Sequence, residues 1–258
     1  MLLIITIVYH IKYIKNWILS NYNNIDKTMK KAIVLVSGGV DSSTVLALLK
    51  EQAYEIYAIS FNYGQKQVVE IKKIQQFIKR YKVKEHKIIN IDLKIFGGSA
   101  LTDNKIVVPN YEQASDLGDQ IPITYVPARN TIFLSYALAF AEIKGAHDIF
   151  LGVHSTDHSN YPDCRLEYIE SFEAMANLAT AEGVRGNKIN IHAPLISMTK
   201  TEIVAMGLAM GVDYSYTISC YDPNLDGESC GKCLACLVRL KAFEENGVLD
   251  PISYIKRN

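Results

Sequence analysis

Residues 32–50 read AIVLVSGGVDSSTVLALLK. The apolar run Ala32–Val36 has the length and composition of a buried strand, and Thr44–Lys50 is typical of a helix. Between the two, Gly38 and Gly39 let the backbone approach an anion closely and adopt conformations that other residues resist. The helix that follows offers unpaired N–H groups and the positive end of its dipole. This stretch therefore predicts a strand–loop–helix unit that binds phosphate groups.

Side chains of the same loop extend the predicted phosphate site. Ser37, Ser42 and Ser43 add hydroxyl donors, and Asp41 can cap the helix or hold Mg²⁺ on the phosphates. The loop is not a Walker A motif, because no Gly-Lys-Ser/Thr follows, and its glycine spacing differs from the dinucleotide fingerprint. A tight turn without a ligand is the alternative interpretation. The residues predicted to bind the nucleotide are Val36, Ser37, Gly38, Gly39, Val40, Asp41, Ser42, Ser43, Thr44, Val45 and Leu46.

Strands and helices alternate along the rest of the chain. Further strands are expected at Tyr54–Phe61, Glu85–Ile91, Asp148–Val153 and Ile189–Ala193. Helices are expected at residues 68–81, where apolar residues recur at helical spacing, and at Thr131–Lys144, Leu166–Ala181, Thr199–Met210 and Leu237–Glu245. The alternation predicts a doubly wound, mainly parallel α/β sheet covered on both faces. Residues 96–125 are expected to be irregular, as lids and binding loops often are.

The length of 258 residues suits one α/β domain with small appendages. With 49% hydrophobic and 21% charged residues and no net charge, the composition is that of a soluble globular protein and favours neither a nucleic-acid nor a membrane partner. Residues 1–19 are apolar but interrupted by His10, Lys12 and Lys15, which argues against a membrane span or a secretory signal. A peripheral membrane anchor is the alternative. We predict an extension outside the fold at residues 1–28, a nucleotide-binding domain at 29–218 and a zinc-binding region at 219–258.

Four of the five cysteines form a Cys-x9-Cys-x2-Cys-x2-Cys motif: Cys220, Cys230, Cys233 and Cys236. Zinc prefers four thiolates in a tetrahedron, and the x2 spacing lets neighbouring sulfurs converge on one ion. An iron–sulfur cluster and a redox pair are the alternatives. The odd number of cysteines argues against a disulfide scaffold and favours a reducing, cytoplasmic location. Cys164 is either an inert packed thiol or a nucleophile with His154 or His158 as its base.

Several segments together resemble the 7-cyano-7-deazaguanine synthase family of the pyrophosphate-loop ATP hydrolases. They are the phosphate loop, residues 61–65 (FNYGQ), 125–130 (YVPARN), 152–165, 193–195 (APL), 200–202 (KTE), 219–221 (SCY) and the cysteine trio. The match extends from about Lys31 to Tyr254, and the YPDCR segment at 161–165 combined with the cysteines is its most specific part. Asn160 departs from the glycine common in the family, and Gln67 stands where many members have histidine.

The resemblance implies an adenine-nucleotide alpha-hydrolase-like fold and a carbon–nitrogen ligase of queuosine precursor biosynthesis. ATP would adenylate the carboxylate of 7-carboxy-7-deazaguanine, free ammonia would displace AMP, and a second ATP would drive dehydration of the amide to the nitrile. Mg²⁺ with ATP and one Zn²⁺ are the implied cofactors. The resemblance implies no direct contact with nucleic acid and no membrane, and it is compatible with a homodimer.

The residues of the chain are compatible with that reaction. Arg129 and Arg165 can fork onto a carboxylate or phosphate, and Lys200 can follow negative charge onto pyrophosphate. A carboxylate can accept the N–H groups of the deazaguanine edge. The expected catalytic residues are Asp41, Lys200, Arg129, Asp163 and Arg165, and the expected substrate-binding residues are Tyr63, Gln65, Asp157 and Asp163. For each of them a structural ion pair or hydrogen bond is the alternative.

Two other functions fit parts of the same pattern. One is another pyrophosphate-loop adenylating ligase, either NAD synthetase-like or tRNA-modifying, and enzymes that act on tRNA usually need a basic surface or an extra domain. The other is a nucleotide-binding zinc module without catalysis. Release of AMP and pyrophosphate separates an enzyme from such a module.

Overall fold

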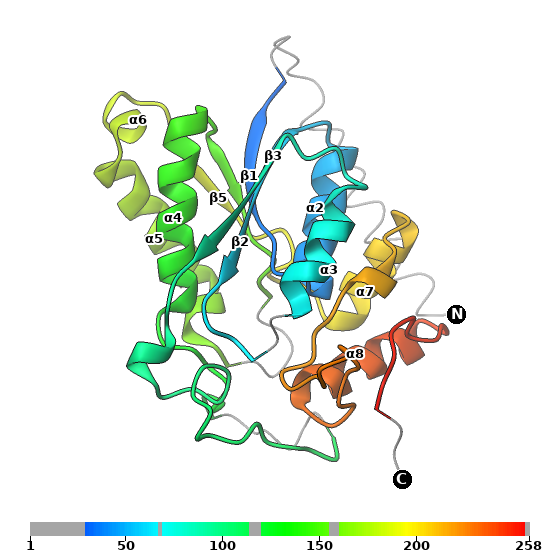
Figure 1. Cartoon of the computed structure of the whole chain (residues 1–258). Coiled ribbons are helices and arrows are strands. Elements are labelled where there is room, and N and C mark those ends of the chain that lie inside the picture. Colours follow the sequence, from blue (N-terminus) through cyan, green and yellow to red (C-terminus); the bar gives the residue numbers. More distant parts are fainter. Residues whose placement is uncertain (1–28, 67–68, 114–119, 155–159, 256–258) are drawn as a thin grey trace.

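The computed structural model describes residues 29–66, 69–113, 120–154 and 160–255, and residues 1–28 lie outside this part (Figure 1). In the described chain one five-stranded sheet has the order β3-β2-β1-β4-β5, and every pairing is parallel. The predicted parallel sheet is therefore confirmed. Its strands are β1 (Lys31–Leu35), β2 (Glu55–Asn62), β3 (Glu85–Asn90), β4 (Asp148–Phe150) and β5 (Asn190–His192).

Helices cover both faces of this sheet, as the doubly wound prediction required. One face carries α2 (Val40–Glu51), α3 (Val69–Ile78) and α7 (Lys200–Ala209), and the other carries α4 (Arg129–Lys144) and α5 (Leu166–Ala179) (Figure 1). Helix α8 (Leu234–Glu245) packs against α7 near the C-terminus. The short helices are α6 (Ala181–Val184), η1 (Lys94–Phe96), η3 (Pro162–Cys164) and η4 (Tyr214–Tyr216). None of the described helices is long and apolar enough to cross a membrane.

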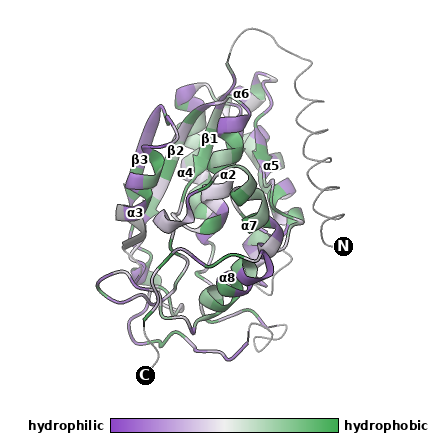
Figure 2. Cartoon of the chain, turned by 90° about the vertical axis from the view of Figure 1, so that its right-hand side faces the viewer, coloured by the Kyte–Doolittle hydropathy of each residue, from purple (hydrophilic) through white to green (hydrophobic). Residues whose placement is uncertain are grey.

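The central strand β1 supplies side chains to two separate cores. Successive residues of a strand point to opposite faces, so Ala32 and Val34 join the core under α2 and α7, whereas Ile33 joins the core under α4 and α5. All three are fully buried, which explains why the strand reads as an unbroken apolar run. Figure 2 shows hydrophobic residues on the central strand β1 and more hydrophilic residues on the edge strand β3 and on α3.

The strand order places a switch point beside the phosphate loop. From β1 the chain continues to β2 and β3 on one side and later returns to β4 and β5 on the other. Sheets of this kind bind ligands in the crevice outside the carboxyl ends of the strands, where the order reverses. The loop after β1 lies at this crevice.

Several predicted boundaries differ from the structure, and three of these differences lie close to the cavity or the cysteines. Helix α2 begins at Val40 rather than Thr44, so the second half of the phosphate loop is already helical. Strand β4 ends at Phe150 rather than Val153. Helix α8 begins at Leu234 rather than Leu237, because Cys233 is its N-cap and the cysteine cluster leads directly into the helix.

The C-terminal segment returns to the cysteine region. Ser229 N–H donates to the carbonyl of Ser253 at 2.9 Å, and Ile255 N–H donates to the carbonyl of Ser229 at 2.9 Å. Tyr254 forms a parallel bridge with Ser229. The last described residues are thereby attached to the segment that carries Cys230.

Candidate active site

A cavity of about 280 Å³ lies at the carboxyl ends of β1, β2 and β4. Residues from nine parts of the described chain line it, among them the phosphate loop, the segment after β4, the starts of α4 and α7, and α8. Its lining therefore combines most of the motifs that the sequence analysis identified, although they are far apart along the chain.

The phosphate loop is held by hydrogen bonds within itself. Ser37 and Ser42 lie with their Oγ atoms 3.1 Å apart, and Ser37 N–H donates to Ser42 Oγ at 3.1 Å. Gly38 has a φ of 92°, which an L side chain rarely adopts, and Gly39 is the N-cap of α2. The first amides of a helix have no acceptor inside it, and Val40, Asp41 and Ser42 of this first turn line the cavity. The loop therefore presents free N–H donors at a helix N-terminus.

Gly152, which follows β4, contacts the same first turn of α2. A Cβ atom at this position would stand 2.8 Å from the nitrogen of Ser42 and 2.9 Å from the carbonyl carbon of Asp41. Both are backbone atoms, so no side-chain rotation can relieve the clash. Only glycine lets the end of β4 pack directly on the phosphate loop.

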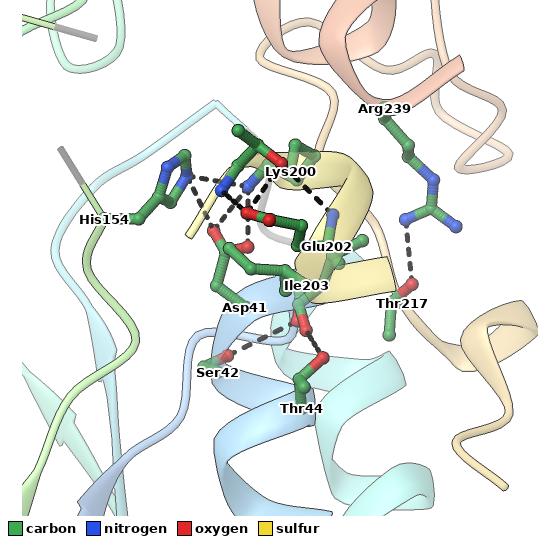
Figure 3. Close-up of polar contacts among 12 residues, drawn as sticks. Asp41, Ser42, Thr44, His154, Lys200, Glu202, Ile203, Thr217 and Arg239 are labelled. Atoms are coloured by element: carbon green, nitrogen blue, oxygen red, sulfur yellow. Dashed lines mark hydrogen bonds and ion pairs between the residues drawn. The ribbon is translucent and has the colours of Figure 1, made fainter. Parts of the chain in front are cut away.

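Lys200, Asp41 and His154 meet at the edge of the phosphate loop (Figure 3). Lys200 Nζ donates to both Asp41 carboxylate oxygens, at 2.6 and 2.7 Å, and lies 3.0 Å from Nε2 of His154. The first turn of α7 places Lys200, and a capping box between Thr199 and Glu202 fixes that turn. Asp41 and Lys200 were expected to be catalytic from two separate motifs, and in the structure they form one ion pair in the cavity wall.

The Asp41 carboxylate is strongly biased toward its charged form. Burial acts to raise its pKa, but the charge of Lys200 and then that of His154 outweigh burial, so the pKa of Asp41 lies below its ordinary value. The pair is therefore an ionised carboxylate beside an ammonium group. These are the group types that bind a divalent cation and a phosphate, respectively.

Aromatic rings and one arginine form another part of the cavity lining. Phe61 and Phe133 stack with centroids 3.9 Å apart, and Tyr63 lies edge-on to Phe133 at 5.5 Å. Arg129, the first residue of α4, lies 5.9 Å from the Tyr63 ring. Within the described chain its guanidinium makes no hydrogen bond or ion pair with another residue, and it lines the cavity. This wall is suited to a flat ring that carries an acidic group.

Two tyrosines continue this wall toward the cysteines. Tyr161 shares a hydrogen bond with Thr124 at 2.9 Å and lies hydroxyl to hydroxyl with Tyr221 at 3.4 Å. Tyr221 directly follows Cys220 and lines the cavity. The cysteine region therefore contributes a side chain to the same cavity.

Two expected substrate residues are occupied by structural contacts. Gln65 accepts from Tyr63 N–H at 2.8 Å and donates to the Phe61 carbonyl at 3.2 Å, so both ends of its amide shape the turn that carries Tyr63. Asp163 accepts from Asn130 N–H at 3.0 Å and is not among the described residues that line the cavity. It secures the start of α4, directly after Arg129.

Other predicted residues lie outside the cavity or outside the described chain. Arg165 is exposed and donates to the Pro162 carbonyl at 3.2 Å. Four predicted nucleotide-binding residues are buried in α2 and do not line the cavity: Ser43, Thr44, Val45 and Leu46. Asp157 belongs to residues 155–159, which the structure does not describe, as does His158.

Cys164 lines the cavity but is not paired with His154, which contacts Asp41 and Lys200 instead. Burial, with the negative charge of Asp163 next, raises the pKa of Cys164 to about 12. A thiol with such a pKa is protonated at neutral pH, which fits the inert interpretation.

The four clustered cysteines have the arrangement of a metal site. One ligand atom from each lies within 4.8 Å of all the others, and three of the four side chains are buried. Backbone N–H groups point at the sulfurs: Cys230 N–H and Asp222 N–H donate to Cys220 at 3.2 and 3.3 Å, and Cys233 N–H donates to Cys230 at 3.3 Å. Such donors stabilise thiolates. The predicted convergence of the four cysteines is confirmed, and together they could hold one metal ion.

Sequence reasoning missed several cavity residues. Phe133, Tyr221 and Arg239 line the cavity, but none of them was selected as a site residue, because each lies in an apolar or cysteine-rich run. Arg239 alone carried a signal, as a charge inside the apolar start of a helix. His154 was considered only as a base for Cys164.

Comparisons with known proteins agree with this arrangement. A family model described as "Queuosine biosynthesis protein QueC" matches residues 31–247. The chain is 62% identical over 227 residues to a protein named 7-cyano-7-deazaguanine synthase from Rickettsia canadensis (strain McKiel), covering 88% of this chain and 100% of that protein. It is 63% identical over 227 residues to the protein of the same name from Rickettsia bellii (strain OSU 85-389), covering 88% and 99%.

Among solved structures, the chain is similar to NMN synthetase from Francisella tularensis, with 15% identity and a TM-score of 0.46 over 92% of this chain and 84% of that one. A 4-thiouridine synthetase–RNA complex with bound ATP matches with 17% identity and a TM-score of 0.48 over 87% and 47%. The family model and the sequence relatives together show that the chain belongs to the QueC family of queuosine biosynthesis proteins.

Proposed function

We propose that this chain is an ATP-dependent ligase that converts 7-carboxy-7-deazaguanine and ammonia to 7-cyano-7-deazaguanine. The observation that carries the proposal is one cavity lined by two different kinds of group. An ionised Asp41–Lys200 pair lines it at a helix N-terminus, and aromatic rings with Arg129 line it as well. Membership of the QueC family and the names of the relatives support the substrate.

The phosphate loop, together with Asp41 and Lys200, is suited to activate a carboxylate. The N–H groups of Gly39 to Ser42 would hold the phosphates of ATP, and Asp41 would hold Mg²⁺, which neutralises their charge when bound. A substrate oxygen attacks the α-phosphorus, the bond to the β-phosphate oxygen breaks, and pyrophosphate leaves. Lys200 follows the charge that moves onto pyrophosphate, and His154 orients its ammonium group.

The aromatic rings and Arg129 in the cavity lining are suited to hold the deazaguanine. Phe133 and Tyr63 offer ring faces and edges for the flat base, and Arg129 can fork onto its carboxylate with two parallel N–H donors. Asp163 acts here through Asn130, by fixing the helix start that carries Arg129. A direct role for Asp157 or Arg165 stays a prediction from the sequence.

Two ATP molecules are needed for each nitrile. The adenylated acid loses AMP when the nitrogen of ammonia attacks its carbonyl carbon, which gives the primary amide. The amide oxygen then attacks a second ATP, and loss of AMP together with the two N–H protons leaves the carbon–nitrogen triple bond. In each step a substrate oxygen attacks the α-phosphorus of an ATP bound in the same position, so one phosphate loop serves both steps.

The cysteine cluster is proposed to hold one structural Zn²⁺. Four thiolates fill a tetrahedral zinc site, so no position stays open for water. Thiolates stay available for a metal in a reducing compartment, which supports a cytoplasmic location. Free ammonia is the proposed nitrogen donor, and the substrate is a free base rather than tRNA.

The deciding experiment measures the products. The protein is incubated with ATP, ammonium and 7-carboxy-7-deazaguanine, and nitrile, AMP and pyrophosphate are quantified. We expect two AMP and two pyrophosphate per nitrile from the acid, and one AMP without ammonia from the amide. ADP as the nucleotide product, or efficient use of glutamine by this chain alone, would contradict the scheme.

A lysine variant and its control locate the chemistry. Lys200→Met should lower both half-reactions together by about 10²- to 10³-fold, as loss of one preorganised electrostatic donor does. Lys188→Met removes another lysine that is ion-paired with a carboxylate, Glu173, but outside the cavity, and should leave turnover unchanged. Loss of only the amide dehydration in Lys200→Met would refute the single-site scheme.

A further inference from the structure

Arg239 is an unusual residue for its position. It lies on α8, one turn beyond Cys236, lines the cavity, and is only 1% exposed. Its guanidinium donates to both carboxylate oxygens of Asp250, at 2.7 and 2.8 Å, and Tyr254 donates to the same carboxylate at 2.6 Å. Burying an ion pair seldom adds net stability compared with apolar residues of similar size. Stability is therefore a weak explanation for an arginine here.

The remaining donors of Arg239 reach the segment that precedes the cysteines. Nη1 donates to Thr217 Oγ1 at 2.8 Å (Figure 3), and Nη2 donates to the Tyr214 carbonyl at 3.3 Å. Thr217 Oγ1 donates in turn to the Tyr214 carbonyl at 2.7 Å. The guanidinium thus holds the turn formed by η4 and Thr217 from one side.

That turn supports the phosphate loop from the other side. Ile218 N–H, directly after Thr217, donates to the Gly38 carbonyl at 3.0 Å. The hydroxyl of Tyr214 lies 2.7 Å from Thr44 Oγ1 on α2. The Gly38 carbonyl and the Gly39 N–H belong to one planar trans peptide, so fixing the carbonyl fixes the direction of the N–H.

A glycine pair has little intrinsic preference that would keep this peptide in place, and within the loop the Gly39 N–H donates to Ser37 Oγ at a long 3.3 Å. Gly38 has a positive φ, and both glycines can adopt many conformations. Preorganised donors are worth more to a bound charge than donors that must first rotate into place. An external restraint on the Gly38 carbonyl therefore has a direct effect on phosphate binding.

We propose that Arg239 is a positioning residue for the nucleotide, which acts through Thr217 and Ile218 to orient the peptide between Gly38 and Gly39. The proposal rests on the proposed function, because it takes the phosphates of ATP as the group that this peptide contacts. It assigns Arg239 no contact with the reacting atoms.

Thr217→Val tests the link with little change in shape. It removes the hydroxyl that accepts from Arg239 and donates to Tyr214, while the buried volume stays nearly the same. We expect the KM and the Kd for ATP to rise about tenfold, the effect of losing about 1.4 kcal/mol of binding free energy. The KM for the deazaguanine carboxylate and the kcat at saturating ATP should change less than about twofold. Thr217→Ser keeps the hydroxyl and should restore ATP binding.

A matched control separates positioning from stability. Thr180→Val also removes a buried hydroxyl with two hydrogen bonds, to the Ala176 carbonyl and from Gly183 N–H, at the start of α6 and outside the cavity. Both variants should lose similar stability in urea unfolding, but only Thr217→Val should lose ATP affinity. Equal ATP affinity in the two variants would overturn the proposal.

Arg239 itself is tested together with Asp250. Replacing Arg239 alone would leave a buried unpaired carboxylate, so the variant of choice combines Arg239→Met with Asp250→Leu, which buries no charge. It should fold and bind ATP at least tenfold more weakly. A folded double variant with the ATP affinity of the wild type would refute the positioning role. Failure of the wild-type protein to bind ATP would instead refute the proposed function.

Discussion

The substitution Gly152→Ala tests how closely the phosphate loop must be placed. The added Cβ would stand 2.8 Å from the nitrogen of Ser42 and 3.1 Å from its Cα. Ordinary contact between such atoms begins near 3.4 Å, so the first turn of α2 and the end of β4 must separate by about 0.6 Å. Gly152 has no positive φ, and alanine therefore adds volume without adding backbone strain.

The expected effect on function follows from that displacement. Productive sites tolerate misplacement of about 0.5 Å, and an error of about 1 Å can lower rates about 10²-fold. The displaced nitrogen of Ser42 is one of the amides proposed to hold phosphate. We therefore expect kcat/KM for ATP to fall about 10- to 100-fold, which corresponds to about 1.4 to 2.7 kcal/mol of transition-state stabilisation. Overpacking should also lower the free energy of unfolding by about 1 to 3 kcal/mol.

The assay is the initial rate of pyrophosphate release over a range of ATP concentrations, together with urea unfolding of the same samples. Gly183→Ala is the matched control, because its Cβ would stand 2.2 Å from the Asn177 carbonyl oxygen, between α5 and α6. It should lose stability and keep its kcat/KM for ATP once corrected for the folded fraction. An unchanged kcat/KM in Gly152→Ala would refute the view that β4 sets the position of the loop.

Other expected outcomes are simpler to measure. Gly39→Ala should keep the stability of the wild type, because its Cβ meets only ordinary contacts at 3.5 and 3.7 Å, yet isothermal titration should show weaker ATP binding if phosphate occupies that space. Cys233→Ser should lower zinc content, thermal stability and activity together, and a stable metal-free variant that lacks only turnover would argue against a structural metal. Cys164 should resist iodoacetamide at pH 8, as judged by mass spectrometry, because its pKa of about 12 keeps the reactive thiolate scarce until much higher pH. A chain that begins at Met29 should keep the turnover and the melting temperature of the full chain, because the family match begins at residue 31, and a large drop in either would show that residues 1–28 contribute.

The sequence predicted those features that depend on neighbours along the chain. The phosphate loop, the parallel sheet and the cysteine motif are each encoded by short-range spacing, and all of them appear in the structure. The end of β4 was missed because Gly152, soon after the strand, lies against α2, a contact with a segment more than a hundred residues away. No local pattern reports such a contact.

The roles of individual side chains were harder to predict. Gln65 and Asp163 carry groups that suit a purine edge, but both also form hydrogen bonds with backbone groups of their own surroundings, which no local pattern predicted. Conversely, Arg239 and Tyr221 reach the cavity only because the cysteine region folds back over the phosphate loop. Chemistry can be read from residue types, but access to a ligand depends on tertiary contacts.

The return of the C-terminal segment to the cysteine region also determines when the protein becomes competent during synthesis. Asp250, Ser253 and Ile255 are made last, yet they hold Arg239 and Ser229, and through Thr217 they support the loop made first. A growing chain therefore carries its glycine loop for most of translation without the partners that immobilise it. Such long-range contacts form late in folding. Under the proposed role of Arg239, chains that end before Asp250 are expected to keep the sequence motif but to bind ATP more weakly than the full chain.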